Sequence, residues 1–407
     1  MVMAMARARA TATATVHAAG KPATTGRLLV AFPPEHGRAM RRHFRNAGLH
    51  HVAAIEDHKQ CYAKLVAEPS AVMHELGIAV VDPRHGATAR AALEKIPYAT
   101  VREEHVLTRA TTTRRAAAAP PTNLDWLETE QSWALSALGI RPRDQDGDGI
   151  LVAVIDSGVT LHPDIRAQVA DRISLIGGSP DDTVGHGTHC AGLIAGSRVP
   201  ARGLRYGVAP NARVLSIRVF DADEAAPEAT VRIALYAAAK RGCRVISLAA
   251  GRMSPSGYSP EDVSLGRFLV AENCVLMAAA GNDSDRAGNN AQPTRAPANA
   301  PFVPAIGALT PRAQVWNDSN GVGDDAATRV DFVAPGTSIV SAWMTGGTMS
   351  VSGTSAATAI AAGFAAAVWS RAPHQTASDL LRALSRMARR MPHAVPGSSG
   401  AGYLQIT

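Results

Sequence analysis

Short apolar runs alternate with longer mixed stretches through residues 123–407. Each run has the length of a strand and lacks the polar alternation of a half-exposed strand. Unbroken apolar strands separated by helices are typical of a parallel sheet covered on both faces. The pattern therefore predicts an α/β domain with a mostly parallel central sheet and helices on both faces. The predicted strands are residues 150–155, 214–219, 245–249, 275–279 and 302–307, and helices such as 230–241 and 263–273 lie between several of them.

A shorter pattern of elements covers residues 27–108. Strand-like runs at 28–32, 51–55, 77–81 and 98–107 are combined with helix-like stretches at 37–47 and 87–96. The order β-α-β-β-α-β is that of the split βαβ motif. We therefore expect a small α+β domain of the ferredoxin-like type before the main domain, with an insertion around residues 57–76.

The segments outside these two patterns have low complexity. Residues 1–26 are small and polar, which predicts a disordered leader. Residues 109–122 show no periodicity and contain a pair of prolines, which predicts a linker and a candidate processing zone. The main domain would then occupy residues 123–407.

The formal net charge of +7 belongs to the N-terminal third of the 407 residues and not to the α/β domain. No nucleic-acid-binding motif or interleaved aromatic residues accompany this charge, so we interpret it as a solvated face and expect no nucleic-acid partner. No apolar stretch approaches the roughly 18 residues of a membrane helix, so we expect no membrane partner. The N-terminus also lacks a clear signal peptide, which leaves cytoplasm and export by an unrecognised route both open.

The four cysteines are Cys61, Cys190, Cys243 and Cys274. Their spacing matches no zinc motif, so we expect buried thiols and no metal site.

Two polar motifs follow or precede predicted elements of the main domain. The strand at 150–155 runs directly into Asp156-Ser-Gly158, at the carboxyl end where parallel strands gather catalytic groups. Alone, Asp156 could equally cap a turn. The second motif is Gly185-His186-Gly187-Thr188-His189, in front of an apolar helix. A zinc reading of the two histidines lacks the glutamate and the spacing of the zinc motif, so we expect His189 to pack structurally.

Two further motifs carry a serine and an asparagine. Ser355, in Gly353-Thr-Ser355-Ala-Ala, opens a long alanine-rich helix, where unpaired N–H groups favour developing negative charge. An ordinary N-cap serine would look the same. Asn282 follows a buried strand that ends in Ala279-Ala280-Gly281, and its amide could donate to an oxyanion.

Taken together, these motifs resemble the subtilisin-like serine proteases, in which Asp, His and Ser follow one another in this order. The resemblance spans residues 123–407, and residues 206–215, 331–339 and 400–404 resemble further segments of the family. Cys190, directly after His189, resembles the thiol-bearing, proteinase K-like members.

The resemblance implies a role for each residue and a polypeptide as substrate. Ser355 would attack the scissile carbonyl, His186 would carry the proton, and Asp156 would orient His186. Asn282 and the Ser355 N–H would hold the oxyanion. An extended peptide would pair with two lining segments, whose members are Ala249, Ala250, Gly251, Ala279, Ala280 and Gly281.

The resemblance extends, more weakly, to the N-terminal domain. Residues 100–108 resemble the last strand and tail of the family's inhibitory prodomain. This implies a zymogen in which the chain's own N-terminal domain is an intramolecular inhibitor. It also implies that Ser355 cuts the chain within residues 109–122.

The chain departs from the family at several positions. Ala356 and Ala359 replace a Met and a Pro in the nucleophile helix, and Ala249, Ala250 and then Arg252 alter the substrate strand, so specificity cannot be transferred. The usual calcium loop, residues 197–205, has no Asp, Asn or Glu, and the acidic turn at 144–149 lacks the final Glu of a calcium loop. We therefore expect no required cofactor, with calcium possible but not supported at the usual loop.

The protease itself could serve general proteolysis or the maturation of one peptide, and two other functions use the same residues. A transpeptidase or macrocyclase would pass the acyl group to an amine, and the product mass would lack the added water of hydrolysis. A catalytically silent peptide-binding scaffold would not react at Ser355 with a fluorophosphonate. The complete set of triad residues and Asn282 favours the protease over this scaffold.

Overall fold

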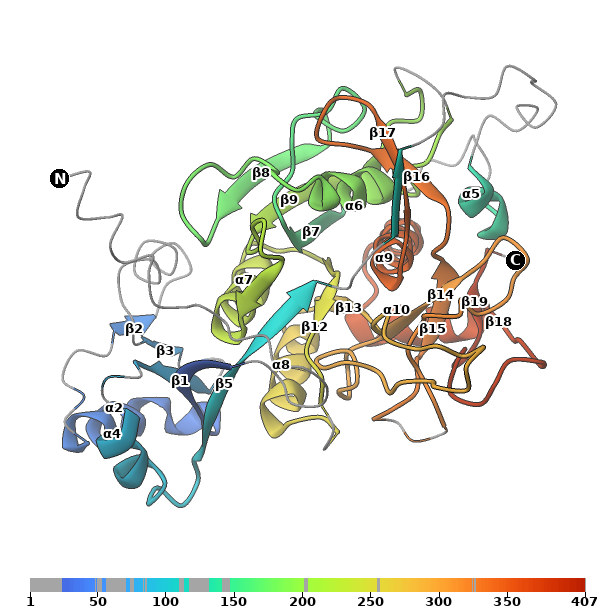
Figure 1. The fold of residues 1–407 in the computed structure, drawn as a ribbon. Coiled ribbons are helices and arrows are strands. Elements are labelled where there is room, and N and C mark those ends of the chain that lie inside the picture. Colours follow the sequence, from blue (N-terminus) through green and yellow to red (C-terminus); the bar gives the residue numbers. More distant parts are fainter. Residues whose placement is uncertain are drawn as a thin grey trace. The chain divides into compact units, whose positions relative to one another are not determined.

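A computed structural model shows the chain as two compact units (Figure 1). The structure describes residues 24–47, 49, 53–55, 71–73, 77–82, 84, 86–109, 113–116, 132–140, 147–200, 204–254, 257–323, 325 and 327–406. One unit contains residues up to Leu107 together with 225–233, and the other contains residues 108–224 and 234–407. None of the helices in the described ranges is long and apolar enough to cross a membrane.

The larger unit is built on a nine-stranded sheet. Its strand order is β18-β19-β15-β14-β13-β11-β7-β9-β8. The pairings from β8 to β19 are parallel, and the β18–β19 pair at one edge is antiparallel. The strands are β7 (Leu151–Asp156), β8 (Val169–Ser174), β9 (Arg213–Arg218), β11 (Val245–Leu248), β13 (Val275–Ala279), β14 (Ala305–Leu309), β15 (Phe332–Pro335), β18 (Ala388–Arg389) and β19 (Tyr403–Leu404).

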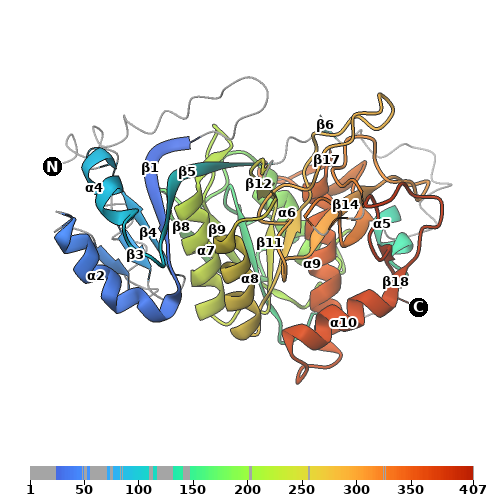
Figure 2. The same ribbon diagram turned by 90° about the horizontal axis from the view of Figure 1, so that it is seen from below.

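Helices cover both faces of this sheet. In both views α8 and residues 234–240 of α7 lie on the side of the sheet away from α9 (Figures 1 and 2). Because both faces are covered, β11 and β13 are buried along their whole length, as their apolar sequences predict. The helices are α5 (Trp133–Ala137), α6 (His186–Ala195), α7 (Glu228–Lys240), α8 (Pro260–Ala271), α9 (Thr354–Ser370) and α10 (Ala377–Met387).

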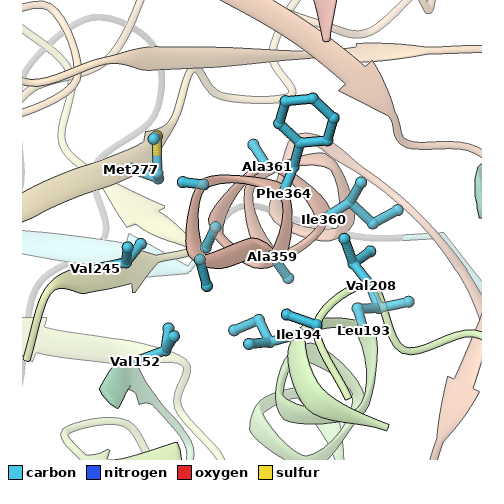
Figure 3. Close-up of a cluster of buried hydrophobic side chains, with 14 of the residues drawn as sticks. Val152, Leu193, Ile194, Val208, Val245, Met277, Ala359, Ile360, Ala361 and Phe364 are labelled. Carbon is cyan, nitrogen blue, oxygen red and sulfur yellow. The ribbon is translucent and has the colours of Figure 1, made fainter. Parts of the chain in front are cut away.

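Helix α9 is the centre of the hydrophobic core. Its residues from Thr354 to Trp369 are all buried, as expected for a helix that is apolar on every side. Figure 3 shows α9 surrounded by Val152, Val245 and Met277 from the sheet and by Leu193 from α6. Alanine has high helix propensity and little bulk, so this sequence forms a helix that neighbouring elements can approach closely.

A small antiparallel sheet leads into α9. Strands β16 (Ile339–Ala342) and β17 (Thr348–Ser352) form a hairpin, and β17 also pairs with β6 (Thr113–Ala116). Thus part of the predicted linker forms a strand beside the segment that precedes Ser355.

The smaller unit contains a sheet of order β10-β5-β1-β4-β3-β2, in which β1 pairs antiparallel with β4 and β5. Helices α2 and α4 pack on it through Met40, Phe44 and Leu93. The elements are β1 (Thr24–Ala31), a 3-10 turn (Pro34–His36), α2 (Gly37–Asn46), β2 (Ala53–Ile55), β3 (Ala71–Met73), β4 (Ile78–Val81), α4 (Gly86–Leu93), β5 (Thr100–Arg109) and β10 (Ala225–Pro227). The last two residues of β5, Thr108 and Arg109, belong to the larger unit.

Residues 225–233 belong to the smaller unit although they lie far downstream in the sequence. Within this unit the Glu104 carboxylate accepts a hydrogen bond from the Ala229 N–H at 2.9 Å. It also forms an ion pair with Arg27 at 2.6 Å. Buried Glu104 thereby provides an acceptor for one of the N–H groups that a helix leaves open at its start.

The α/β fold predicted from the sequence is confirmed, and the predicted strands and helices lie within a few residues of the observed ones. The largest shift is at the predicted strand 28–32, because β1 already begins at Thr24. The predicted strand 302–307 is observed as β14, which begins at Ala305 after Phe302 with its left-handed φ of 70°. Of the predicted leader, residues 1–23 lie outside the described residues, and Thr24 begins β1.

Candidate active site

Several of the predicted site residues lie at the carboxyl ends of neighbouring parallel strands. Asp156 is the last residue of β7, Ala249 follows β11, and Ala280 follows β13. In Figure 1, β7 and β13 lie close together beside α9. The parallel registers of β11 with β7 and with β13 bring these three strand ends to one edge of the sheet.

A buried carboxylate and imidazole form the first contact of the site. The His186 Nδ1 atom lies 2.9 Å from each oxygen of the Asp156 carboxylate. Both residues are 1% exposed. The Ser157 N–H also donates to Asp156 Oδ1, at 2.8 Å. These bonds orient His186 and place a proton on Nδ1, so its Nε2 atom can accept one.

The pKa of Asp156 results from opposing effects. Burial alone would raise it, because an ionised carboxylate loses its hydration. The His186 charge and hydrogen bond, the Arg109 charge and the Ser157 N–H outweigh burial and lower the pKa below the ordinary value. The Asp156 carboxylate is therefore ionised beside the imidazole.

A second buried carboxylate, Asp182, holds the start of the helix that carries His186. Helix α6 has Gly185 at its N-cap, which has no side chain to satisfy the first N–H groups. Asp182 Oδ2 accepts from the Thr188 N–H at 2.8 Å and hydroxyl at 2.7 Å, and Oδ1 accepts from the Gly185 N–H at 2.7 Å. The Ser157 hydroxyl donates to Asp182 Oδ1 at 2.9 Å and accepts from the Gly187 N–H at 3.0 Å.

The sequence reasoning missed both Asp182 and Ser157. The signal for Asp182 is a carboxylate a few residues before a helix whose N-cap is glycine. The signal for Ser157 is its position next to Asp156. Through these two residues the loop after β7 is tied directly to the first turn of α6.

Gly187 has to be glycine because of this close approach. A Cβ atom there would lie 2.1 Å from the Gly158 carbonyl oxygen and 3.2 Å from the Asp156 Cβ. Any side chain at position 187 would therefore push α6 away from the strand that carries Asp156.

Ser355 is the second residue of α9 and is fully buried. Within the described ranges neither the Ser355 Oγ nor the His186 Nε2 has a hydrogen-bond partner, although both atoms are buried. Unpartnered buried polar atoms are rare in folded proteins and cost free energy. Here both belong to the groups that would exchange a proton during nucleophilic attack.

Thr354 fixes the orientation of Asn282. Its N–H and its hydroxyl both contact Asn282 Oδ1, at 2.9 and 2.7 Å. Because an N–H can only donate, the contacting Asn282 atom is the oxygen, and the amide nitrogen points the other way. The Thr354 hydroxyl also accepts from the Gly281 N–H at 3.3 Å. Thr354 is a positioning residue that the sequence reasoning did not single out.

The predicted substrate-lining residues are all buried and lie on two segments. Gly281 has a left-handed φ of 112°, and a Cβ there would lie 2.5 Å from the Asn320 amide nitrogen. Strand β12 (Ala250–Gly251) pairs antiparallel with residues of this same unit, Thr108 and Arg109. The lining residues are Ala249, Ala250, Gly251, Ala279, Ala280 and Gly281.

Arg252, which follows these residues, is a structural residue. Its guanidinium forms an ion pair with Asp262 at 2.5 Å in the first turn of α8. Arg252 is 4% exposed and its backbone exchanges two hydrogen bonds with Ala296. It therefore anchors the end of the substrate-lining segment to α8.

His189 packs structurally, as predicted. It is fully buried, and its Nε2 atom lies 3.0 Å from the Ile339 carbonyl oxygen and 3.2 Å from that of Met349. Its ring meets Trp343 edge-on. Burial and the nearby His186 charge lower the pKa of His189 to about 3, so the ring is neutral at neutral pH.

The Cys190 thiol lies beside the imidazole, with its Sγ atom 3.8 Å from His186 Nδ1. Burial, followed by the Asp156 charge, raises the pKa of Cys190. The thiol is therefore protonated and a poor nucleophile. Asp156, His186 and Cys190 could also surround a metal ion, but the two 2.9 Å contacts identify the first two as a hydrogen-bonded pair.

Both loops considered for calcium lie partly outside the described residues. In the stretch 197–205, residues 201–203 are not described, and in the turn 144–149 residues 144–146 are not described. The residues at 197–205 include no carboxylate or amide side chain and do not fit a calcium ion.

Comparison with known proteins shows which fold and family the chain resembles. The profile of the subtilase family matches residues 147–402. A cuticle-degrading protease from Metarhizium anisopliae is 33% identical over 58% of this chain and 61% of its own length. Thermitase from Thermoactinomyces vulgaris is 30% identical over 65% of this chain and 87% of its own length. The match thus spans about 60% of the first of these relatives.

Solved structures give the same result. A cold-adapted subtilisin-like serine proteinase superposes with a TM-score of 0.57 at 26% identity, over 68% of this chain and 98% of its own. Fervidolysin from Fervidobacterium pennivorans, a keratinolytic enzyme related to subtilisin, reaches a TM-score of 0.70 over 96% of this chain and 61% of its own. At 19% identity, the second comparison supports the fold alone.

Replacing Asp182 by asparagine should destabilise the larger unit. Asn would present an N–H₂ donor where the Thr188 N–H and hydroxyl need an acceptor. We expect the free energy of unfolding to fall by about 2–3 kcal/mol, the cost of leaving such buried groups unsatisfied. Urea unfolding in a Ser355→Ala background measures this. The neighbouring, exposed Asp181→Asn is the matched control, and an equal loss in both variants would contradict the assignment.

Acid should destabilise the folded chain through His189. Its folded pKa of about 3 lies below the unfolded value near 6.5. The unfolded state therefore binds more protons between these values, and this contribution to stability is lost as the pH falls from 6.5 to 3. In His189→Gln, whose amide can donate to the same carbonyls, the midpoint of thermal unfolding should fall less steeply over this range. Parallel pH curves for the two proteins would contradict the assignment.

Proposed function

The chain belongs to the subtilase family, and from this premise we propose that it is a serine endopeptidase that hydrolyses peptide bonds through an acyl-enzyme on Ser355. Two observations carry the proposal. His186 Nδ1 and Asp156 form a buried hydrogen-bonded pair, and among the described residues the buried His186 Nε2 and Ser355 Oγ atoms have no hydrogen-bond partner.

The reaction follows from the properties of these side chains. His186 Nε2 takes the proton of Ser355 Oγ as that oxygen attacks the scissile carbonyl carbon. The imidazolium that forms is stabilised by Asp156, which is already ionised and held by Ser157. His186 then gives the proton to the leaving amine as the C–N bond breaks, and the acyl group remains on Ser355 as an ester. A water molecule, deprotonated by His186, attacks this ester, and the carboxylic acid leaves as Ser355 recovers its proton.

The oxyanion is stabilised by donors that are fixed before the reaction. Ser355 lies in the first turn of α9, whose N–H groups have no partner within the helix. The Asn282 amide is oriented by Thr354. Because such donors need no reorganisation when charge develops, each contributes roughly 3–4 kcal/mol to the transition state.

The peptide substrate binds as an additional strand beside the lining segment that contains Ala250 and Gly251. Support comes from the pairing of Thr108 with Gly251 and of Arg109 with Ala250, in which a stretch of the chain itself takes this position. Backbone pairing gives affinity without demanding a particular side chain.

The same pairing supports a self-processing zymogen. In this scheme the domain at residues 27–108 is an intramolecular inhibitor, and the tail after it is the first substrate. The cut falls between Arg109 and Thr113. Arg109 pairs with β12, and Thr113 pairs with Ser352 of β17, three residues before Ser355. The peptide bonds between these two anchored residues are the ones that can reach the nucleophile.

A Ser355→Ala chain should remain uncut. Without the hydroxyl there is no acyl-enzyme, so intact mass spectrometry of the expressed protein should give the full-length mass. The wild-type chain and Ser350→Ala, a control on β17, should give a product that begins within residues 110–113. Normal processing of Ser355→Ala would refute self-cleavage. A catalytic amount of processed wild-type protein should cut the variant if its fold is intact.

A further inference from the structure

The chain's own tail also indicates which substrate side chain the cleft selects. In an added strand, the backbone is read by pairing and alternate side chains enter pockets. Because Arg109 pairs with Ala250, its side chain samples the pocket that a substrate would meet at that position. This inference therefore rests on the proposed function and deepens it.

Glu224 contacts Arg109 in two ways. The Arg109 guanidinium forms an ion pair with the Glu224 carboxylate through Nη2. The Arg109 N–H also donates to the Glu224 carbonyl oxygen at 2.9 Å. Glu224 holds an unusual backbone conformation, with a left-handed φ of 55°. Glu224 lies at the end of a turn, in which its N–H donates to the Asp221 carbonyl oxygen. This turn presents the Glu224 carboxylate and carbonyl oxygen to Arg109.

The pocket buries the positive charge. The Arg109 side chain is 1% exposed, whereas that of Glu224 is 34% exposed. Within the described residues, Arg109 Nε and Nη1 are buried without a hydrogen-bond partner. Such a cation is tolerated only where carboxylates compensate for its lost hydration. Glu224 supplies the direct contact, and Asp156 of the triad lies within electrostatic reach.

We propose that Glu224 is a specificity residue, which selects a basic side chain at the substrate position that pairs with Ala250. Arginine suits the pocket better than lysine, because the guanidinium is more weakly hydrated and loses less on burial. A neutral side chain forfeits the ion pair, and an acidic one meets two carboxylates, Glu224 and Asp156.

Short peptides test the pocket directly. The parent peptide has the sequence of residues 103–113, which contains one arginine, and variants carry Lys, Ala or Glu in place of Arg109. The wild-type chain is expressed at full length, the protein is recovered after self-processing, and kcat/KM is measured for each peptide. We expect the Arg peptide to exceed the Ala peptide by about 30-fold, the usual scale for losing one partner of a buried charge pair. Lys should be intermediate and Glu lowest.

Variants of the pocket assign the preference to Glu224. In Glu224→Gln the Arg-to-Ala ratio should fall to about 3 or less, and in Glu224→Lys the Glu peptide should overtake the Arg peptide. Asp223→Asn removes the same charge from the neighbouring exposed residue and should keep the wild-type ratio. If the Glu224 variants do not fold, the peptide series on the wild-type protein still shows whether the cleft prefers a basic side chain at this position.

The outcomes separate this inference from the proposed function. A wild-type protein that cuts these peptides with an Arg-to-Ala ratio near one overturns the inference and leaves the protease standing. An unchanged ratio in Glu224→Gln overturns the role of Glu224. A protein that neither processes itself nor cuts any peptide overturns the proposed function and this inference with it.

Discussion

The buried contact between Asp156 and His186 is the constraint around which the larger unit is organised. An ionised carboxylate is costly to bury, and here the cost is offset by the imidazole, the Ser157 N–H and the charge of Arg109. The contact also requires that β7 and α6 approach closely. Glycine at position 187 permits the approach, and Asp182 with Ser157 satisfies the open N–H groups of the helix.

In the other half of the site, close packing and fixed polar contacts likewise determine where the side chains lie. Helix α9 must bring Ser355 to the sheet edge while its own first turn stays open to a reacting oxygen. Alanine-rich packing buries the helix on all sides, and Thr354 uses its N–H and hydroxyl to hold Asn282. The proposed nucleophile and the proposed oxyanion donors are thus fixed by one turn of one helix.

The α/β fold could be predicted, and the candidate triad residues could be singled out, because their signals are local. Apolar runs reveal buried strands, and Asp156, His186 and Ser355 each lie in a short motif next to an element. Asp182 and Glu224 could not be predicted in the same way. Their roles depend on which distant groups the fold brings to them: backbone N–H groups of α6 for Asp182, and Arg109 of the tail for Glu224. Residues 225–233 likewise belong to the smaller unit through tertiary packing, which periodicity does not report.

The proposed function requires the activation of Ser355 as a nucleophile by Asp156 and His186. It is tested most directly by treating the processed chain with a fluorophosphonate and locating the label by peptide mass spectrometry. We expect one label for each chain, on the peptide that contains Ser355. Labelling should be at least about 1,000-fold slower in Asp156→Asn, which disturbs the proton position on His186. An absence of label, a label on another serine, or an equal rate in Asp156→Asn would contradict it.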